Sequence, residues 1–340
     1  MIKWLQSETG GSFVLMINSA AHFLVDATCA AALFGGGVEA LVPALLLYNT
    51  LAFSTQCLVG LLTDRIGRCK SISAAACLLV AAGFFLPLPP MAKAAAVGLG
   101  NSLFHVAAGT VTLERSGGKA WPLGVFVAPG SLGLALGTLY PGFGWLFAAL
   151  LALCGAGIAF LKVPLPDKGS LEPAPRGGGL LAVLLLLAVA ARALGGTAVD
   201  FPWKTGAALS VMTACYVLAG KAAGGFLCDR LGAGRTVLFS LPAAALLIAF
   251  GAESMGLSLL GQFLLNLTMP VTLLLIYRCL PKEPGFAFGL AASALWPGTL
   301  AGQLIGNAGS LAPLWIIGSF IMGLAAILLA AKGEKVEKVS

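Results

Sequence analysis

Apolar segments long enough to cross a lipid bilayer follow one another along almost the whole chain, separated by short polar loops. A membrane-spanning α-helix needs roughly 20 such residues. Only 10% of the 340 residues are charged, whereas an ordinary soluble domain carries roughly 25%. A soluble core could not cover this much apolar surface. The sequence therefore excludes a water-soluble fold and predicts an integral membrane protein in contact with lipid.

Twelve segments have the length of a span, which predicts an all-α integral membrane fold of twelve transmembrane helices. Residues 163–178 interrupt the series with four prolines and the first two of three consecutive glycines, and they predict a cytoplasmic linker. We expect an N-terminal six-helix bundle over residues 1–162 and a C-terminal six-helix bundle over residues 179–340. The predicted spans are 12–34, 38–61, 71–88, 92–112, 121–139, 143–162, 179–198, 206–227, 235–252, 255–277, 285–306 and 311–331.

The placement of the basic residues predicts the orientation of the chain. If the N-terminus is cytoplasmic, 16 of the 20 Lys and Arg residues lie on the cytoplasmic side and two in outer loops. The remaining two, Arg192 and Lys221, fall within spans. This split follows the positive-inside rule and predicts that both termini are cytoplasmic, with the bacterial inner membrane as the expected location. Topology thus explains the net charge of +7, and no nucleic-acid partner is expected.

Four short motifs of the first half recur in the second half in the same order. Each recurs at nearly the same offset, between 161 and 170 residues, which indicates a duplicated six-helix unit. Both copies begin on the same side of the membrane, so the repeat is parallel, about an axis along the membrane normal. The motif pairs are 60–67 with 225–232, 100–105 with 261–266, 129–133 with 297–302, and 20–24 with 190–194.

The loop between the second and third spans carries a specific pattern. It resembles the signature loop of the major facilitator superfamily, and its degenerate copy lies between spans eight and nine, as in that family. The pattern consists of Gly60, Leu62, Asp64, Arg65, Gly67 and Arg68. The resemblance implies the major facilitator fold, a monomer and transport by alternating access.

Two further patterns resemble the fosmidomycin-resistance branch of that superfamily. One is His22-Phe-Leu-x-Asp26 in span one, and the other ends in Phe104-His105 in span four. The branch usually has proline after this second histidine, where the present chain has Val106. The resemblance implies proton-coupled antiport, with efflux of small anionic or drug-like molecules.

The signature loop is interpreted as a gating element. Asp64 ends a helix where arginines and the N-terminus of a neighbouring helix can hold it in one state, and its release would let the halves move. Asp229 and Arg230 are expected to act in the same way, but less completely, because Ala233 replaces the second arginine. The alternative is a solvated loop that only enforces the topology.

Span one carries polar residues on one face. Asn18, His22 and Asp26 are spaced at i, i+4 and i+8. A carboxylate near mid-membrane costs at least ~2.5–3.5 kcal/mol, so Asp26 needs a partner, a proton or water. We interpret Asp26 and His22 as proton-coupling residues and Asn18 as a substrate contact. The alternatives are a carboxylate paired permanently within the bundle and a structural histidine.

Span four offers a second polar face. His105 follows Asn101 by one turn; we assign His105 to proton coupling and Asn101 to the substrate site. Asn266 occupies the position equivalent to His105 in the second half, where it is expected to line the cavity or to make a structural hydrogen bond.

Arg192 lies too deep in span seven to reach the membrane surface easily, and a guanidinium stays charged. It is predicted to bind an anionic substrate group or to pair with Asp26, since spans one and seven line the cavity of the inferred fold. The alternative is a structural ion pair. Lys221 in span eight could add a second positive charge or extend to the interface. Tyr48, Gln56 and Tyr216 are further candidates for the cavity lining, or for contacts between helices.

The sequence favours a secondary transporter over the other classes of protein. It contains no P-loop and no nucleophile–base–acid set, so neither ATP-driven transport nor an enzyme is expected. No cofactor and no metal site is expected, because no ligand spacing is visible. The expected partners are a small, anionic molecule, protons and membrane lipids. An uncoupled facilitator or an exporter of neutral lipophilic compounds is the alternative, and an intramembrane enzyme or lipid-handling protein is the different class.

Overall fold

The computed structural model describes residues 8–36, 40–161, 174–175, 177–306 and 312–337. Every regular element in these ranges is a helix, which confirms the all-α prediction. The chain divides into two compact units: unit 1 comprises Met1–Gly117, Val125–Ser170 and Glu283–Gly289, and unit 2 the rest. Most of the predicted linker, residues 163–178, lies outside the described residues.

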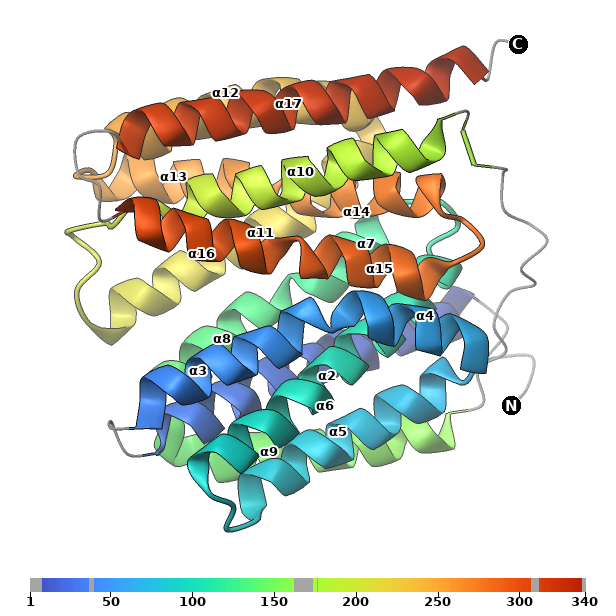
Figure 1. Cartoon of the computed structure of the whole chain (residues 1–340), viewed down its shortest axis with the longest axis vertical. Helices are drawn as coiled ribbons and strands as arrows, with labels where there is room; N and C mark the ends of the chain where they lie inside the picture. The colour runs from blue at the N-terminus through green and yellow to red at the C-terminus, as the bar shows by residue number, and fades with distance from the viewer. Residues whose placement is uncertain (1–7, 37–39, 162–173, 176, 307–311, 338–340) are drawn as a thin grey trace. The chain divides into compact units, whose positions relative to one another are not determined.

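Unit 1 contains the helices of the first half of the chain. Within it α5 lies beside α6 (Figure 1) and also packs on α9, and α2 packs on α6, α8 and α9. Its helices are α2 (Glu8–Phe34), α3 (Leu41–Asn49), the π-helical turn η2 (Thr50–Ser54), α4 (Gln56–Ile66), α5 (Cys69–Phe85), α6 (Pro90–Arg115), α8 (Pro129–Leu139), η3 (Pro141–Phe143) and α9 (Gly144–Phe160).

Unit 2 contains the helices of the second half, among which α17 packs on α10 and α12. Two helices cross a unit boundary: the first residues of α7 (Trp121–Val127) belong to unit 2, and the first residues of α15 (Pro284–Ser293) belong to unit 1. The other helices are α10 (Gly178–Thr197), α11 (Gly206–Leu231), α12 (Ala233–Phe250), α13 (Met255–Asn266), α14 (Thr268–Cys279), α16 (Leu295–Gly306) and α17 (Ala312–Glu337).

All twelve predicted spans coincide with helices in the described part of the chain. Nine stretches there are long and apolar enough to cross a membrane. A tenth is possible if α3 with η2 forms one span together with α4, although the two parts are bent by 42°. Of the other two segments, α5 is apolar but has 17 residues, and α15 with α16 covers the eleventh prediction. The chain is therefore a multi-pass integral membrane protein.

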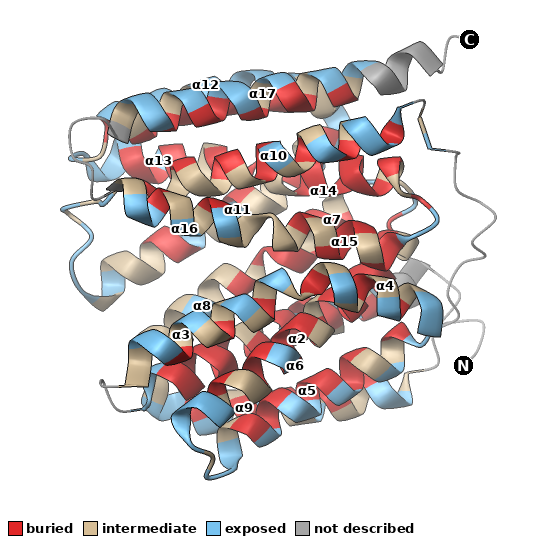
Figure 2. Cartoon of the chain, in the orientation of Figure 1, coloured by how far each residue is buried: buried red, intermediate tan, exposed pale blue. Residues whose placement is uncertain are grey.

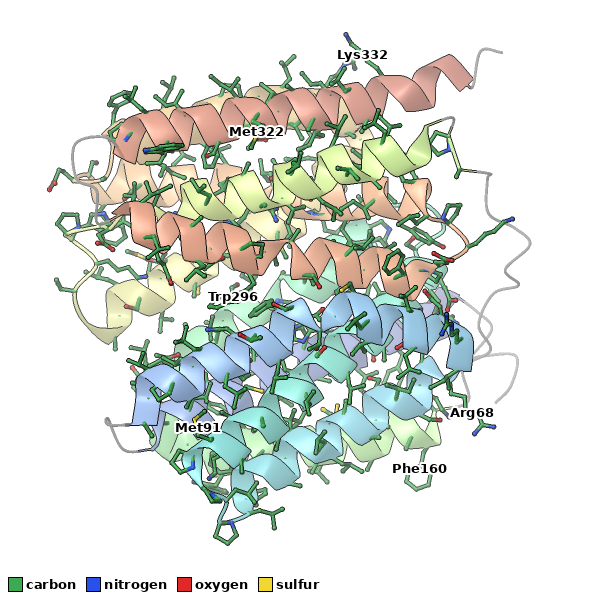
Figure 3. All side chains as sticks on the ribbon, viewed as in Figure 1. Arg68, Met91, Phe160, Trp296, Met322 and Lys332 are labelled. Carbon is green, nitrogen blue, oxygen red and sulfur yellow. The ribbon has the colours of Figure 1, made fainter. Side chains whose placement is uncertain are left out.

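Many large apolar side chains lie on the outside of the units, as expected for helices in lipid. Phe160 is 86% exposed and points away from its helix (Figure 3). Along α17 buried and exposed positions alternate (Figure 2), and the exposed ones include Leu314 and Met322. A soluble protein would bury such residues, so this surface agrees with a lipid environment.

Glycines bring helix backbones into contact within each unit. Gly133 and Gly137 of α8 lie against α2, and Gly298 and Gly302 of α16 lie against α10. A Cβ at any of the four would approach backbone atoms of the partner helix closer than 3.0 Å. Small residues spaced in this way drive helix association in membranes, where no hydrophobic effect acts between helices. The contact between α2 and α8 positions the site described next.

Candidate functional site

The main polar site of unit 1 lies where α2 packs on α6. His22 and Asp26 are one turn apart on α2, and Asn101 and His105 are one turn apart on α6. Residues i and i+4 share one face of a helix, so each pair presents its side chains in one direction. The two pairs meet, and we call these four residues the histidine–aspartate cluster.

Both imidazole rings of the cluster are anchored through Nδ1. His22 Nδ1 lies 2.8 Å from the carbonyl oxygen of Phe126, and His105 Nδ1 lies 2.9 Å from the carbonyl oxygen of Asn101. The two Nε2 atoms then face one another at 2.9 Å. The rings meet edge to face, with centroids 4.4 Å apart. The two histidines are therefore held in direct contact by the backbone of α6 and α7.

Asp26 lies beside both rings. Its Oδ2 is 3.4 Å from His22 Nε2, and its Oδ1 is 3.6 Å from His105 Nε2. Asn101 Nδ2 donates a hydrogen bond of 3.1 Å to Oδ1. The carboxyl side chain is 18% exposed. An ionised group inside a membrane is costly unless it is paired, and here the amide and the two imidazoles supply the partners.

The cluster has the chemistry of a site for a proton or a metal ion. Ligand atoms of His22, Asp26 and His105 all lie within 4.8 Å of one another. Histidines that bind a metal usually donate the other ring N–H to a carbonyl or carboxylate, and both rings here have such a contact. No ligand spacing is visible in the sequence, because the two histidines are 83 positions apart. Only the packing of α2 on α6 brings them together.

Gly130 belongs to this site, although the sequence alone does not place it there. It lies in the first turn of α8, and a Cβ there would overlap Asp26 Oδ2 and lie 2.5 Å from His22 Nε2. The Pro129-Gly130 pattern by itself predicts only a close helix contact or a bend. The structure shows a close contact of Gly130, and its partners are the side chains of the cluster. The space between them is too small for a methyl group.

The other predicted substrate contacts of unit 1 are buried. Asn18 is 4% exposed and Tyr48 8% exposed, and Tyr48 interacts with Cys29 and Asn101. Gln56 is 1% exposed and donates from Nε2 to the carbonyl of Ala52, within the π-helical turn η2. Its Oε1 has no hydrogen-bond partner among the described residues. Single π-helical turns occur frequently at functional sites.

Arg192 is the buried cation of unit 2. Its side chain lies on α10, is 9% exposed, and donates a long hydrogen bond of 3.5 Å to Thr268 Oγ1. That hydroxyl donates in turn to the carbonyl of Leu265 at 2.8 Å. Within the described residues of unit 2 no carboxylate forms an ion pair with Arg192. The guanidinium therefore has donors available for an anionic group, and its predicted pairing with Asp26 stays a prediction.

The remaining predicted substrate contacts also lie in unit 2. Asn266, the counterpart of His105, donates from Nδ2 to the carbonyl of Gln262 at 2.8 Å. That amide is thus hydrogen-bonded to its own helix. Lys221 and Tyr216 lie on α11; Lys221 is partly buried and Tyr216 is 41% exposed.

Asp64 binds the N-terminus of α15. Its Oδ1 accepts the backbone N–H of Gly285 and its Oδ2 that of Phe286, both at 2.8 Å. The first N–H groups of a helix have no partner within it, and the helix dipole favours an anion there. Gly67 ends α4 with a φ of 65°, a conformation that glycine adopts without strain. Gly60 permits the close approach, because a Cβ there would overlap the backbone at Gly285.

Asp229 makes the equivalent contact in unit 2. Its Oδ1 accepts the N–H of Ala120 at 2.7 Å and its Oδ2 that of Trp121 at 2.9 Å, at the start of α7. Gly232 follows with a φ of 85°, and Gly225 lies against Ala120 as Gly60 lies against Gly285. Both copies of the predicted motif therefore hold a helix N-terminus by the same two hydrogen bonds.

The arginines of the two motifs lie at the surface. The exposed residues are Arg65, Arg68 and Arg230. Figure 3 shows Arg68 pointing away from the helices around it. The gating role of these motifs stays a prediction.

Solved structures of one transporter of the major facilitator superfamily have the same fold. The fucose:proton symporter FucP of E. coli, in a single-residue variant, matches with a TM-score of 0.70 at 11% identity, over 94% of this chain and 97% of that chain. FucP in an outward conformation matches with a TM-score of 0.67 at 13% identity and the same coverage. No family model matches the chain, and no curated protein matches it by sequence. The predicted major facilitator fold is confirmed.

Proposed function

We propose that this chain is a secondary active transporter, which moves a small, anionic or drug-like molecule across the membrane by alternating access coupled to protons. The observation that carries the proposal is the histidine–aspartate cluster inside an apolar bundle. Ionisable residues within membrane helices are rare and mark ion or proton pathways. The fold supports the same conclusion, since the solved structures that share it are transporters.

Proton coupling rests on the chemistry of the cluster. Imidazole is the side chain that changes charge most readily near neutral pH, and two imidazoles and a carboxylate lie in contact here. Binding or losing one proton changes the net charge of the cluster by one unit in a low-dielectric environment. Such a change alters the relative stability of two conformations strongly, which is what coupling requires.

The proposed substrate class rests on Arg192. A buried guanidinium without a carboxylate partner in its own unit needs an anion, water or a partner in another state to offset its desolvation. Bidentate binding of a carboxylate or phosphonate by arginine is strong and geometrically specific. Efflux is the proposed direction, by resemblance to the fosmidomycin-resistance branch. FucP itself is described as a symporter, so the direction has to be measured.

Alternating access is proposed to involve the bundles of residues 1–162 and 179–340. Asp64 and Asp229 would stabilise one state by holding the N-termini of α15 and α7, and breaking these bonds would release it. We further propose that the chain acts as a monomer in a bacterial inner membrane, with both termini cytoplasmic.

A two-step experiment tests this function. Purified protein is first screened by thermal shift at pH 5.5 and 7.5 with small phosphonates, carboxylates, neutral sugars and cationic drugs. The compounds that stabilise it are then added to proteoliposomes that contain a trapped pH-sensitive dye. We expect an anion to stabilise the wild type and its movement to change the internal pH.

Two variants make the test specific. Asp26→Asn should reduce or abolish the pH change, whereas Asp200→Asn, at an exposed position after α10, should not. Transport that proceeds without any pH change would establish the uncoupled facilitator instead. Stabilisation by neutral or cationic compounds alone would show that the proposed substrate class is wrong.

A further inference from the structure

The two Nδ1 contacts determine the tautomers of the histidines. A carbonyl oxygen accepts hydrogen bonds and cannot donate one. Because His22 Nδ1 contacts the carbonyl of Phe126 and His105 Nδ1 that of Asn101, both Nδ1 atoms carry a proton. In a neutral imidazole the other nitrogen is then a bare acceptor. Two neutral rings would thus present two bare Nε2 atoms to each other.

The distance between these Nε2 atoms is 2.9 Å. Two lone pairs repel at this distance, whereas an N–H group and an acceptor nitrogen form an ordinary hydrogen bond. The contact therefore requires one additional proton between the rings. The histidine pair then carries three N–H protons and a charge of +1.

Asp26 supplies the opposite charge. Its oxygens lie 3.4 and 3.6 Å from the two Nε2 atoms, farther away than the nitrogens are from each other. Asn101 donates to Asp26 Oδ1, and this hydrogen bond stabilises the ionised carboxylate. With Asp26 at −1 and the pair at +1, the cluster as a whole is neutral, as a group inside a membrane bundle should be.

The surrounding helices add no nearby charge. Helices α3, α7, α8 and α9 contain no Asp, Glu, Lys or Arg, and their titratable side chains are Tyr48 and Cys154. On α4, α5 and α6 the charged residues lie near the helix ends. Cys29, a further titratable neighbour, lies on α2 and is fully buried. Among the described residues of unit 1, Asp26 is thus the carboxylate that lies beside the histidine pair.

From this geometry we infer that the proton that drives transport is bound between His22 Nε2 and His105 Nε2, and that Asp26 is its permanent counter-ion. One proton enters, one N–H···N hydrogen bond forms, and the carboxylate stays ionised. When the proton leaves, the two bare nitrogens repel, so the α2–α6 contact has to loosen. The inference rests on the proposed function. Of the three residues that the sequence predicts for proton coupling, it assigns the proton to His22 and His105 and the counter-charge to Asp26.

Nuclear magnetic resonance can test this inference directly, because the chain contains only two histidines. Protein labelled with ¹⁵N-histidine, purified through a tag without histidine and reconstituted in lipid, reports these two rings alone. At low pH we expect protonated Nδ1 on both rings and a scalar coupling between the two Nε2 nuclei across the hydrogen bond. At high pH the coupling should vanish and the Nε2 signals should shift to those of bare nitrogens.

Two variants serve as controls. His105→Gln leaves a single histidine, so the coupling must be absent at every pH. In Asp26→Asn the shared proton should be lost at a proton concentration about 10- to 1,000-fold higher than in the wild type, because an adjacent opposite charge stabilises a cation by that factor. An unchanged titration in Asp26→Asn would refute the counter-ion role.

Other outcomes separate this inference from the proposed function. If no coupling appears and ¹³C labelling shows the Asp26 carboxyl itself titrating while proteoliposomes still move protons, the shared proton is refuted and the transporter stands. If the coupling appears but no compound moves protons, the transporter proposal fails. If added Co²⁺ gives ligand-field absorption and displaces the shared proton at neutral pH, the site is a metal site and the inference is overturned.

Discussion

Replacing Gly130 with alanine tests whether the cluster is as tightly packed as its geometry indicates. The added Cβ would lie 2.5 Å from His22 Nε2 and 2.9 Å from His22 Cδ2, whereas ordinary contact begins at 3.4 Å. The Cβ would also overlap Asp26 Oδ2, so either the carboxylate must move together with the ring, the ring by about 0.9 Å, or α8 must move away from α2. A displacement of this size takes the Nε2–Nε2 pair, now at 2.9 Å, toward or beyond the limit of a hydrogen bond.

The expected cost follows from general magnitudes. Overpacking typically destabilises by about 1–3 kcal/mol, and the loss of a hydrogen bond to a charged group adds about 1.5–3 kcal/mol if the ring moves. Alanine offsets at most about 1 kcal/mol through its higher helix propensity. We therefore expect Gly130→Ala to destabilise the protein by roughly 2 kcal/mol, given partial relaxation of the site.

Thermal unfolding in detergent measures this effect, with Gly142→Ala as the matched control. Gly142 has no atom within 4 Å of a Cβ position, so its replacement should leave the melting temperature nearly unchanged. Gly130→Ala should melt clearly lower and should weaken or abolish the coupling between the two histidines. Equal melting temperatures together with an intact coupling would refute the tight packing of α8 on the cluster.

Three further predictions concern the helix ends and the buried cation. Asp64→Asn replaces two charged acceptor oxygens with one neutral acceptor, so it should lower the free energy of unfolding by about 1.5–3 kcal/mol. Glu253→Gln, at an exposed position, should not lower it. Equal melting curves for the two variants would contradict the contact between Asp64 and α15. Gly67→Ala should lower the free energy of unfolding by about 1–2 kcal/mol, because the φ of 65° at this position is unfavourable for a residue with a side chain. Gly67→Asn should lower it less, and equal losses in the two variants would exclude backbone strain as the cause. Arg192→Leu should leave the melting temperature unchanged or raise it, because it removes a charge that has no ion-pair partner among the described residues of unit 2. The same variant should no longer be stabilised by anions. A large loss of stability would instead make Arg192 structural.

The sequence determined the secondary structure almost completely. In lipid every backbone polar group must be satisfied within its own segment, so an apolar run of sufficient length can only be a helix. This is why all twelve predicted segments fall on helices. The sequence did not reveal the π-helical turn Thr50–Ser54 or the bend that follows it. Such a turn changes the hydrogen-bond register of the backbone without changing the hydropathy of the segment.

The sequence also singled out candidate site residues, because charge within an apolar span is costly wherever it occurs. His22, Asp26, His105 and Arg192 stand out for that reason alone. Helical periodicity placed His22 with Asp26, and Asn101 with His105, since i and i+4 share a face. These inferences are local, and the structure agrees with them.

Only the tertiary structure decided which of these faces meet. The contact of His22 with His105, the carbonyl of Phe126 that orients one ring and the fit of Gly130 against the cluster join residues from α2, α6, α7 and α8. Helix packing is set by the shape of whole surfaces, above all by the glycines that let α8 approach α2. Hydrogen-bond tautomers and shared protons depend on distances of a few tenths of an ångström, which no periodicity in a sequence encodes.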